Sequence, residues 1–138
     1  MDKPKYYTDY HQQEKLVKLG IDPNTADFSF TNKIGRYTYS YIHEYFLPYS
    51  EAVYHKESSE CIYPCWSVGA LIDLLPNTIS LKNGSCRRVI DVWDWQHRVC
   101  YMYPNSQECF FHCELGGNLF DCVYNMLIFL IENGYFSK

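Results

Sequence analysis

Arginine residues stand close to aromatic residues at several points along the chain. Arg36 opens the segment RYTYSY, Arg88 lies on a segment that ends in tryptophan, and Arg98 follows the next turn. A guanidinium beside aromatic faces can stack on a flat ring and pair with a phosphate or a carboxylate. Alternatively, the tryptophans form the core face of a strand and the arginines are solvated. For the ligand-binding hypothesis, the predicted site residues are Arg36, Tyr37, Tyr39, Arg88, Trp95 and Arg98.

Two cysteine pairs have a spacing that resembles a zinc site only superficially. Cys61 and Cys65 are four positions apart, as are Cys109 and Cys113, and His112 adjoins the second pair. On a strand, two residues four positions apart are separated by about 13 Å, because the rise per residue is about 3.3 Å. That separation is too large for two thiolates that share one zinc ion at about 2.3 Å per bond. We therefore interpret the cysteines as reduced, mostly buried thiols, and we predict no metal and no cofactor.

Sequence motifs for catalysis are missing. The chain has no nucleophile elbow, phosphate loop, Gly-rich dinucleotide turn or metalloprotease helix motif, and its five histidines are scattered. We predict no catalytic residue. A small hydrolase that uses a cysteine and a histidine is retained as an alternative, since such residues meet only in the folded chain.

Composition narrows the class of protein. The chain has 138 residues, a length typical of one domain, so residues 1–138 are predicted to form a single globular domain. Its net charge of −4 gives no basic footprint for a nucleic acid. No apolar run has the length of a signal peptide core or of a membrane span, so we expect a cytoplasmic protein that has no membrane partner. The seven cysteines, an odd number, argue against a closed disulfide framework.

The long apolar segment that follows Asn118 dominates the remaining pattern. Asn118 is a helix cap, Gly134 is a stop signal, and apolar residues between them recur at helical spacing on more than one face. We predict a buried C-terminal helix whose apolar excess covers a sheet or meets a second copy of the chain. Earlier helices are predicted from Thr8 or Asp9 to about Leu19, as a short turn after Asp22, and from Ser67 to Pro76.

Strands are predicted where aromatic and β-branched residues alternate with polar ones. The first lie at residues 28–30 and 36–46, and residues 48–60 are predicted to be an exposed loop or a frayed helix. Three turns then separate the strands 78–82, 86–93, 98–103 and 108–114, and the first turn is the hairpin signal Asn83-Gly84. The resulting fold class is α+β: an antiparallel sheet of about four or five strands with a C-terminal meander, packed on one face by two or three helices.

Three blocks of the sequence resemble a known group of proteins. They are KLVKLGIDPNTADF near the start, PCWSVGALIDLLP in the middle and DCVYNMLIFLIENGYF at the end. In this order they are similar to small proteins encoded by phages and prophage-like elements of gut Bacteroidetes. The resemblance implies a phage or mobile-element protein that acts in the cytoplasm of a bacterial host cell.

These observations lead to one main functional hypothesis and two alternatives. The main hypothesis is a non-catalytic, phage-encoded binding protein with a counter-defence role, which sequesters a nucleotide-like small ligand or blocks a host protein. The first alternative is a structural or assembly protein that forms a homo-oligomer through its apolar C-terminal helix. The second is the small Cys/His-dependent hydrolase.

Overall fold

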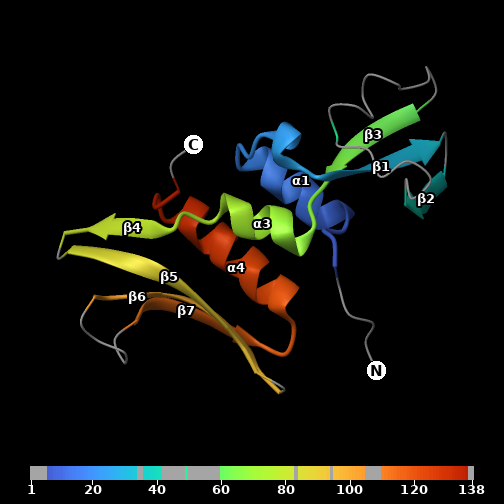
Figure 1. The fold of residues 1–138 in the computed structure, drawn as a ribbon. Helices are drawn as coiled ribbons and strands as arrows, with labels where there is room; N and C mark the ends of the chain where they lie inside the picture. The colour runs from blue at the N-terminus through green and yellow to red at the C-terminus, as the bar shows by residue number, and fades with distance from the viewer. Residues whose placement is uncertain are drawn as a thin grey trace. The chain divides into compact units, whose positions relative to one another are not determined.

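The fold comprises two compact units. The structure is a computed structural model that describes residues 6–33, 36–41, 49, 60–82, 84–93, 95–104 and 110–136. One unit comprises residues 6–70, and the described residues from Leu71 onward form the other. The boundary falls inside helix α3 (Val68–Leu74) (Figure 1). The single domain expected over residues 1–138 stays a prediction.

The first unit begins with helix α1 (Tyr10–Lys18), which is fixed at both ends by local signals. The Asp9 side chain accepts a hydrogen bond from the Gln12 backbone N–H, and the Gln12 side chain accepts one from the Asp9 N–H. This capping box satisfies two of the N–H groups that a helix leaves unpaired. After the helix, Gly20 adopts a φ of 94°, which favours glycine. The predicted helix and the predicted turn after Asp22, observed as η1 (Pro23–Thr25), are both confirmed.

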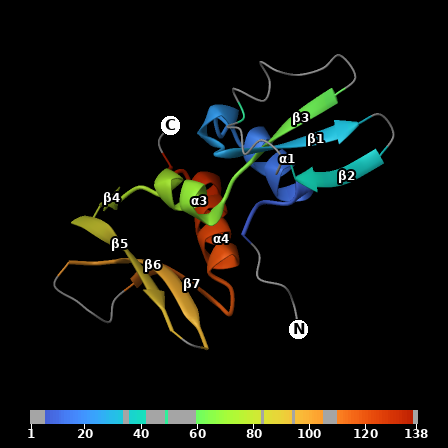
Figure 2. The ribbon, with the colours of Figure 1, turned by 45° about the vertical axis from the view of Figure 1, so that its right-hand side comes forward.

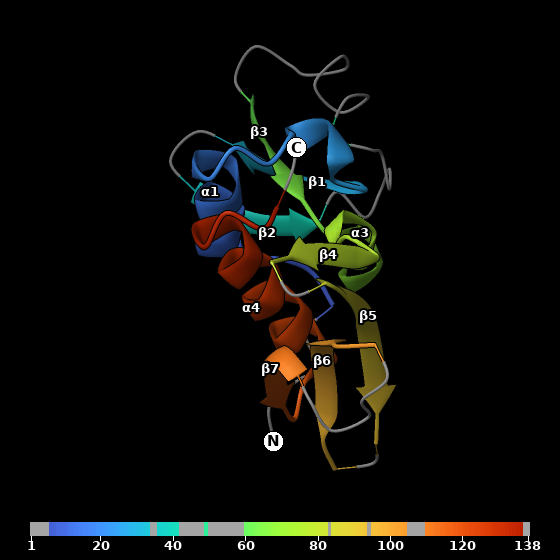
Figure 3. The same ribbon diagram turned by 90° about the vertical axis from the view of Figure 1, so that its left-hand side faces the viewer.

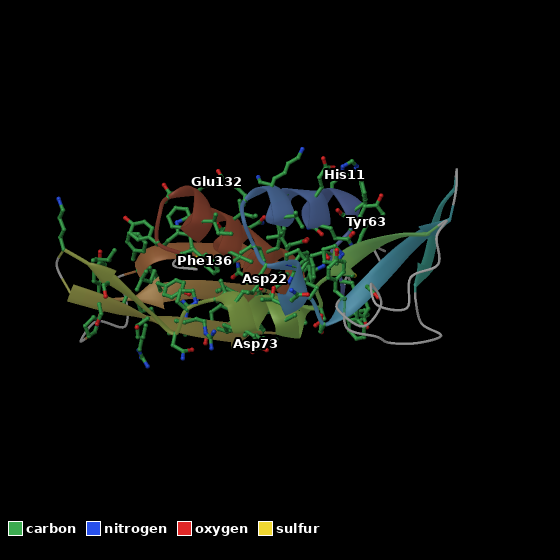
Figure 4. The ribbon with its side chains drawn as sticks, turned by 90° about the horizontal axis from the view of Figure 1, so that it is seen from above. His11, Asp22, Tyr63, Asp73, Glu132 and Phe136 are labelled. Carbon is green, nitrogen blue, oxygen red and sulfur yellow. The ribbon has the colours of Figure 1, made fainter. Side chains whose placement is uncertain are left out.

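Three antiparallel strands form the sheet of this unit. β1 (Phe28–Lys33) lies in the centre, and β3 (Glu60–Cys65) lies at one edge (Figure 2). The third strand was not predicted, because Pro64 interrupts its pattern. β3 is an edge strand of the sheet, where the missing N–H of a proline is tolerated. Tyr63 of β3 meets Tyr10 of α1 edge-on at 5.4 Å, close to His11 (Figure 4). β2 (Arg36–Tyr41) lies at the other edge of the sheet. Apart from Tyr49 and Glu60, the predicted loop 48–60 lies outside the described residues, as do residues 42–46 of the second predicted strand.

Trp66, which is fully buried, anchors the first unit. Its indole N–H donates to Thr25 Oγ1 at 2.9 Å, and its backbone N–H donates to Thr8 Oγ1 at 3.0 Å. The Thr8 N–H donates in return to the Trp66 carbonyl at 2.9 Å. Ser67 then accepts from the Ala70 N–H at 3.2 Å and starts α3, as the sequence predicted. Trp66 is therefore explained by packing and hydrogen bonding alone.

The second unit contains the predicted meander. Its strands are β4 (Thr78–Leu81), β5 (Gly84–Val92), β6 (His97–Met102) and β7 (Phe110–Gly116), and each is antiparallel to the next. Gly84 pairs with Leu81, so the first hairpin is closed one residue earlier than expected. The α+β class is confirmed. Within the described residues the strands form two sheets, and the predicted C-terminal meander, part of an expected sheet of about four or five strands, corresponds to the four-stranded one.

Helix α4 (Leu119–Glu132) packs against β6 and β7 of this sheet (Figure 3). The Asn118 side chain accepts from the Phe120 N–H at 2.8 Å and caps the helix, and Gly134 follows its end with a φ of 79°. The exposed positions of α4 include Asp121, Asn125 and Glu132, which are polar. Most of the apolar surface of α4 is buried, and the homo-oligomer stays a prediction. The buried residues are Phe120, Cys122, Val123, Tyr124, Met126, Leu127, Ile128 and Leu130.

The two faces of the four-stranded sheet differ in what covers them. The His112 ring of β7 stacks flat on Phe129 of α4 at 3.5 Å, which identifies the face that the helix covers. Side chains alternate along a strand, so Tyr101, opposite His112, shares this face, whereas Arg98 and Cys100 lie on the other. Within the described part of the chain, α3 and α4 both lie on the His112 side (Figures 1 and 2). We call the opposite side the outer face.

Candidate functional site

An ion pair lies on the outer face of the four-stranded sheet. Asp91 of β5 and Arg98 of β6 are directly opposite in the antiparallel register. The Arg98 Nε donates to Asp91 Oδ2 at 2.9 Å, and Nη2 donates to the same oxygen. These hydrogen bonds raise the pKa of Arg98 above its ordinary value. The side chains are 21% and 31% exposed, so the pair is partly shielded from solvent and its charges neutralise each other.

Two aromatic rings flank this guanidinium. The Arg98 Cζ lies 5.2 Å from the centre of the Trp93 ring and 5.0 Å from the centre of the Phe110 ring. Both distances are within the range of a cation–π interaction. Trp93 follows β5 and Phe110 begins β7, so three segments of the chain converge on Arg98. The rings and the ion pair hold one another in place on the open side of the sheet.

Further apolar side chains extend this group outward. The Trp95 ring stacks on Trp93 with centroids 6.1 Å apart, and Leu115 pairs with Arg98 from the β7 side. Trp93 is 42% exposed, Trp95 78% and Leu115 57%. Large apolar groups gathered at one exposed place mark a binding surface more often than scattered ones do. We name this group the Arg98 cluster; its members are Asp91, Trp93, Trp95, Arg98, Phe110 and Leu115.

Of the three predicted ligand-binding residues whose side chains the structure describes, two lie together and the third lies on the other face of the same sheet. Trp95 and Arg98 both belong to the Arg98 cluster, where Trp93 connects them. Arg88 belongs to the same sheet but lies on the face opposite Arg98, because it is three residues from Asp91 on β5. Arg36, Tyr37 and Tyr39 are on β2 of the other unit, and their side chains lie outside the described part of the structure.

Arg88 contributes to the fold of its unit. Its Nη1 donates to the carbonyl oxygens of Ile72 and Leu75, each at 3.0 Å, at the end of α3, where the Ile72 carbonyl also accepts from the Leu75 N–H at 3.0 Å. A hollow of about 460 Å³ adjoins this contact, and its lining includes Asp73, Asn77 and Phe136 (Figure 4). The Asp73 carboxylate and the negative end of the helix dipole both disfavour an anion there. The hollow therefore does not match the phosphate-binding role predicted for Arg88.

The cysteines and histidines give no support to a zinc site or a hydrolase among the described residues. Cys65 and Cys113 belong to different units, and the side chains of Cys61 and Cys109 lie outside the described set. No three metal-binding side chains gather anywhere in the described part of the chain. His112 bonds Glu114 Oε1 through its Nε2 at 2.8 Å and stacks on Phe129, which gives it a packing role.

Sequence reasoning missed several members of the Arg98 cluster. The turn expected at residues 94–97 would place Trp93 opposite Arg98, whereas the structure pairs Val92 with His97 and therefore Asp91 with Arg98. From the sequence, Trp93 is either a neighbour of the arginines or a core-face residue of its strand, and it is not among the six predicted site residues. Phe110 and Leu115 could not have been found, because their register depends on the longer connection before β7 and on an irregularity between Tyr101 and Met102.

Comparisons with known proteins add no assignment. No family model matches the chain, and neither the curated proteins nor the solved structures give a significant match. Within the described residues, every helix is too short or too polar to cross a membrane.

Proposed function

We propose that this chain is a non-catalytic binding protein and that the Arg98 cluster binds an apolar, uncharged surface of a partner protein. The observation that carries the proposal is the exposure of Trp93, Trp95 and Leu115 around an arginine that is already paired within the chain. Tryptophan and arginine are the residue types most enriched at the energetic centres of protein interfaces.

The size of the exposed rings supports a useful affinity. A tryptophan side chain buries up to about 250 Å², so complete burial of the exposed part of Trp95 would remove nearly 200 Å² from water. At about 25 cal/mol per Å², this area corresponds to a gross gain of about 4–5 kcal/mol before the costs of association are subtracted. Truncation of such a residue typically costs 2 kcal/mol or more, or roughly 30-fold in Kd.

The charges of the cluster indicate the chemistry of the partner. Asp91 and Arg98 neutralise each other, so the centre of the surface attracts neither an acidic nor a basic group strongly. A partner that presents apolar side chains would bury the rings without leaving a charge unpaired. The resemblance to phage proteins implies that this partner is a protein of the bacterial host, and blocking it would be the counter-defence role.

Affinity capture from a lysate of the bacterial host tests the proposal. The wild-type chain, Trp95→Ala and Val17→Ala serve as baits; Val17 is a matched control because it is an apolar side chain of α1 that is 42% exposed. We expect a host protein that wild type and Val17→Ala capture at both low and high salt and that Trp95→Ala loses. With that protein purified, Trp95→Ala should weaken Kd about 30-fold or more. Equal capture by all three baits would contradict the proposal.

A nucleotide-like ligand is the second candidate, because the stacked Trp93 and Trp95 rings beside Arg98 could also hold a base and a phosphate. The two candidates differ in their salt dependence. Phosphate binding weakens as salt is raised, whereas burial of apolar surface does not. Titration of nucleotides against tryptophan fluorescence at two salt concentrations separates them. Saturable quenching that disappears at high salt and in Trp95→Ala would favour the nucleotide.

A further inference from the structure

Two cysteines face each other across the β6–β7 ladder. Cys100 of β6 and Cys113 of β7 are direct partners in the antiparallel register, between the pairs Val99–Glu114 and Tyr101–His112. Directly opposite residues in such a ladder have Cα atoms about 4.5 or 5.5 Å apart, depending on the type of pair. Both values fall within the range of about 4.4–6.8 Å that a disulfide requires. Their pairing in the ladder therefore gives a Cα separation that is compatible with a disulfide.

The two thiols are free and near each other. Neither is part of a disulfide, and each is close enough to shift the pKa of the other. Cys100 is fully buried, whereas Cys113 is only half-buried and can be reached from the outer face. Arg98 is close enough to act electrostatically on both. The Cys113 thiol is thus accessible to a reagent in solution, whereas the Cys100 thiol is buried beside it.

Other described cysteines lack this arrangement. Cys86 is opposite Ile79 in its hairpin, and Cys65 is opposite Phe28. Cys122 lies on α4, where its Sγ contacts the carbonyl oxygen of His97 at 3.7 Å. Among the cysteines whose side chains the structure describes, Cys100 and Cys113 are the pair that could react with each other without a change in the backbone.

We propose that Cys100 and Cys113 form a dithiol modification site that reacts with low-molecular-weight disulfides and closes to an intramolecular disulfide between β6 and β7. The site is independent of the proposed binding function, since it rests on the pairing of Cys100 with Cys113 in the strand register and on the partial exposure of Cys113. It differs from the pairing of Cys109 with Cys113 that the sequence brought to attention, because its partners come from adjacent strands.

The reaction proceeds in two balanced steps. The Cys113 thiolate attacks one sulfur of the small disulfide, forms a mixed disulfide and releases one thiolate, which takes up a proton. The Cys100 thiolate then attacks Cys113 Sγ and expels the second thiol of the reagent. The protein loses two electrons and two protons, and the small disulfide gains both as two thiols.

The order of attack follows from the surroundings of each sulfur. Burial raises the pKa of both thiols, that of Cys100 to about 11, and the Arg98 guanidinium partly counters this effect at both. The Cys100 side chain acts to lower the pKa of Cys113, whereas the Cys113 side chain acts to raise that of Cys100. Cys113 is also the more exposed sulfur, so it is the one that a small disulfide reaches first.

Oxidised glutathione is the probe that tests this proposal. The full-length reduced chain is incubated with it, free thiols are alkylated, and the products are analysed by intact mass and by peptide mapping without reduction. We expect wild type to lose two hydrogen atoms and to yield linked peptides that contain Cys100 and Cys113. Cys100→Ser should stop at one glutathione on Cys113, and Cys86→Ser should behave as wild type.

Two results would overturn the proposal. The first is a wild-type chain that forms no intramolecular disulfide while a thiol reagent still labels Cys113. The second is a disulfide that maps to another pair, such as one that contains Cys109. Because the wild-type mapping decides both, the test does not depend on whether Cys100→Ser folds; circular dichroism of that variant shows whether its mass result can be used.

Discussion

Replacement of Arg88 by methionine gives a direct test of the role that the structure assigns to it. Methionine keeps an unbranched apolar stem but removes the guanidinium, and with it the hydrogen bonds to the Ile72 and Leu75 carbonyl oxygens. Arg87 is the matched control, because it is the same residue type one position earlier on β5, exposed and on the outer face. Arg88→Met should therefore destabilise the fold, and Arg87→Met should not.

The expected magnitude follows from the two hydrogen bonds. A hydrogen bond to a charged group contributes roughly 1.5–3 kcal/mol net. Arg88 is half-buried and uses one nitrogen for both acceptors, so the pair together should contribute a value at the lower end, about 2 kcal/mol. Arg87→Met should change the free energy of unfolding by less than about 0.5 kcal/mol, as is usual for surface substitutions.

Urea denaturation followed by circular dichroism measures this difference. With a slope of about 2 kcal/mol per M, Arg88→Met should lower the midpoint by about 1 M and leave the slope unchanged. If Arg88→Met were as stable as wild type, the proposed role of Arg88 in holding the end of α3 would be refuted. Arg88 would then again be a candidate for ligand binding. Destabilisation by Arg87→Met alone would show that the assignment of the two faces of β5 is reversed.

Two further predictions concern buried polar groups. Tyr101→Phe should cost about 1–2 kcal/mol in the free energy of unfolding, because the buried hydroxyl donates to the Pro76 carbonyl at 2.7 Å; Tyr6→Phe, at a position 60% exposed, should cost nothing measurable by urea denaturation. Burial raises the pKa of Cys65 and of Cys100 to about 11 in the folded chain, compared with about 8.5 in an unfolded chain. As pH rises, the unfolded state therefore loses these two protons before the folded state does. The free energy of unfolding should fall as pH rises from about 9 to 11. Urea midpoints of the reduced protein across that pH range check this, and a Cys100→Ala variant that lost stability as steeply as wild type would exclude a contribution from Cys100.

Local signals in the sequence predicted most of the elements correctly. Asp9, Asp22 and Asn118 cap helices through hydrogen bonds between nearby residues, so the information needed to predict them lies within a few positions of each. The meander from β4 to β7 followed from short turns, whose geometry also depends on neighbouring residues. These are the cases in which sequence and structure are related through contacts of short range.

Long-range pairing explains what the sequence did not reveal. β3 pairs with β1 although the paired residues, from Lys33–Glu60 to Phe28–Cys65, are far apart in the sequence, and its Pro64 is acceptable only because the strand lies at the edge of a sheet. Likewise, Phe110 reaches Arg98 through the β6–β7 register, which contains an irregularity near Tyr101. Neither partner could be identified without knowing which strands are neighbours. The division of the strands into two sheets was missed for the same reason.

The arginines on β5 and β6 show how strand parity assigns different roles to one residue type. Arg88 faces the helices and holds the end of α3, whereas Arg98 faces outward and lies between two aromatic rings. Asp91 is directly opposite Arg98, so these two side chains share a face. Arg88 is three residues from Asp91 on the same strand, so its side chain lies on the other face. The predicted ligand site includes both arginines because each is near a tryptophan in the sequence. In the structure, their side chains lie on opposite faces of one sheet. The same parity places Cys100 and Cys113 on the side of Arg98, so the binding surface and the dithiol site share a face, and separate variants are needed to test them.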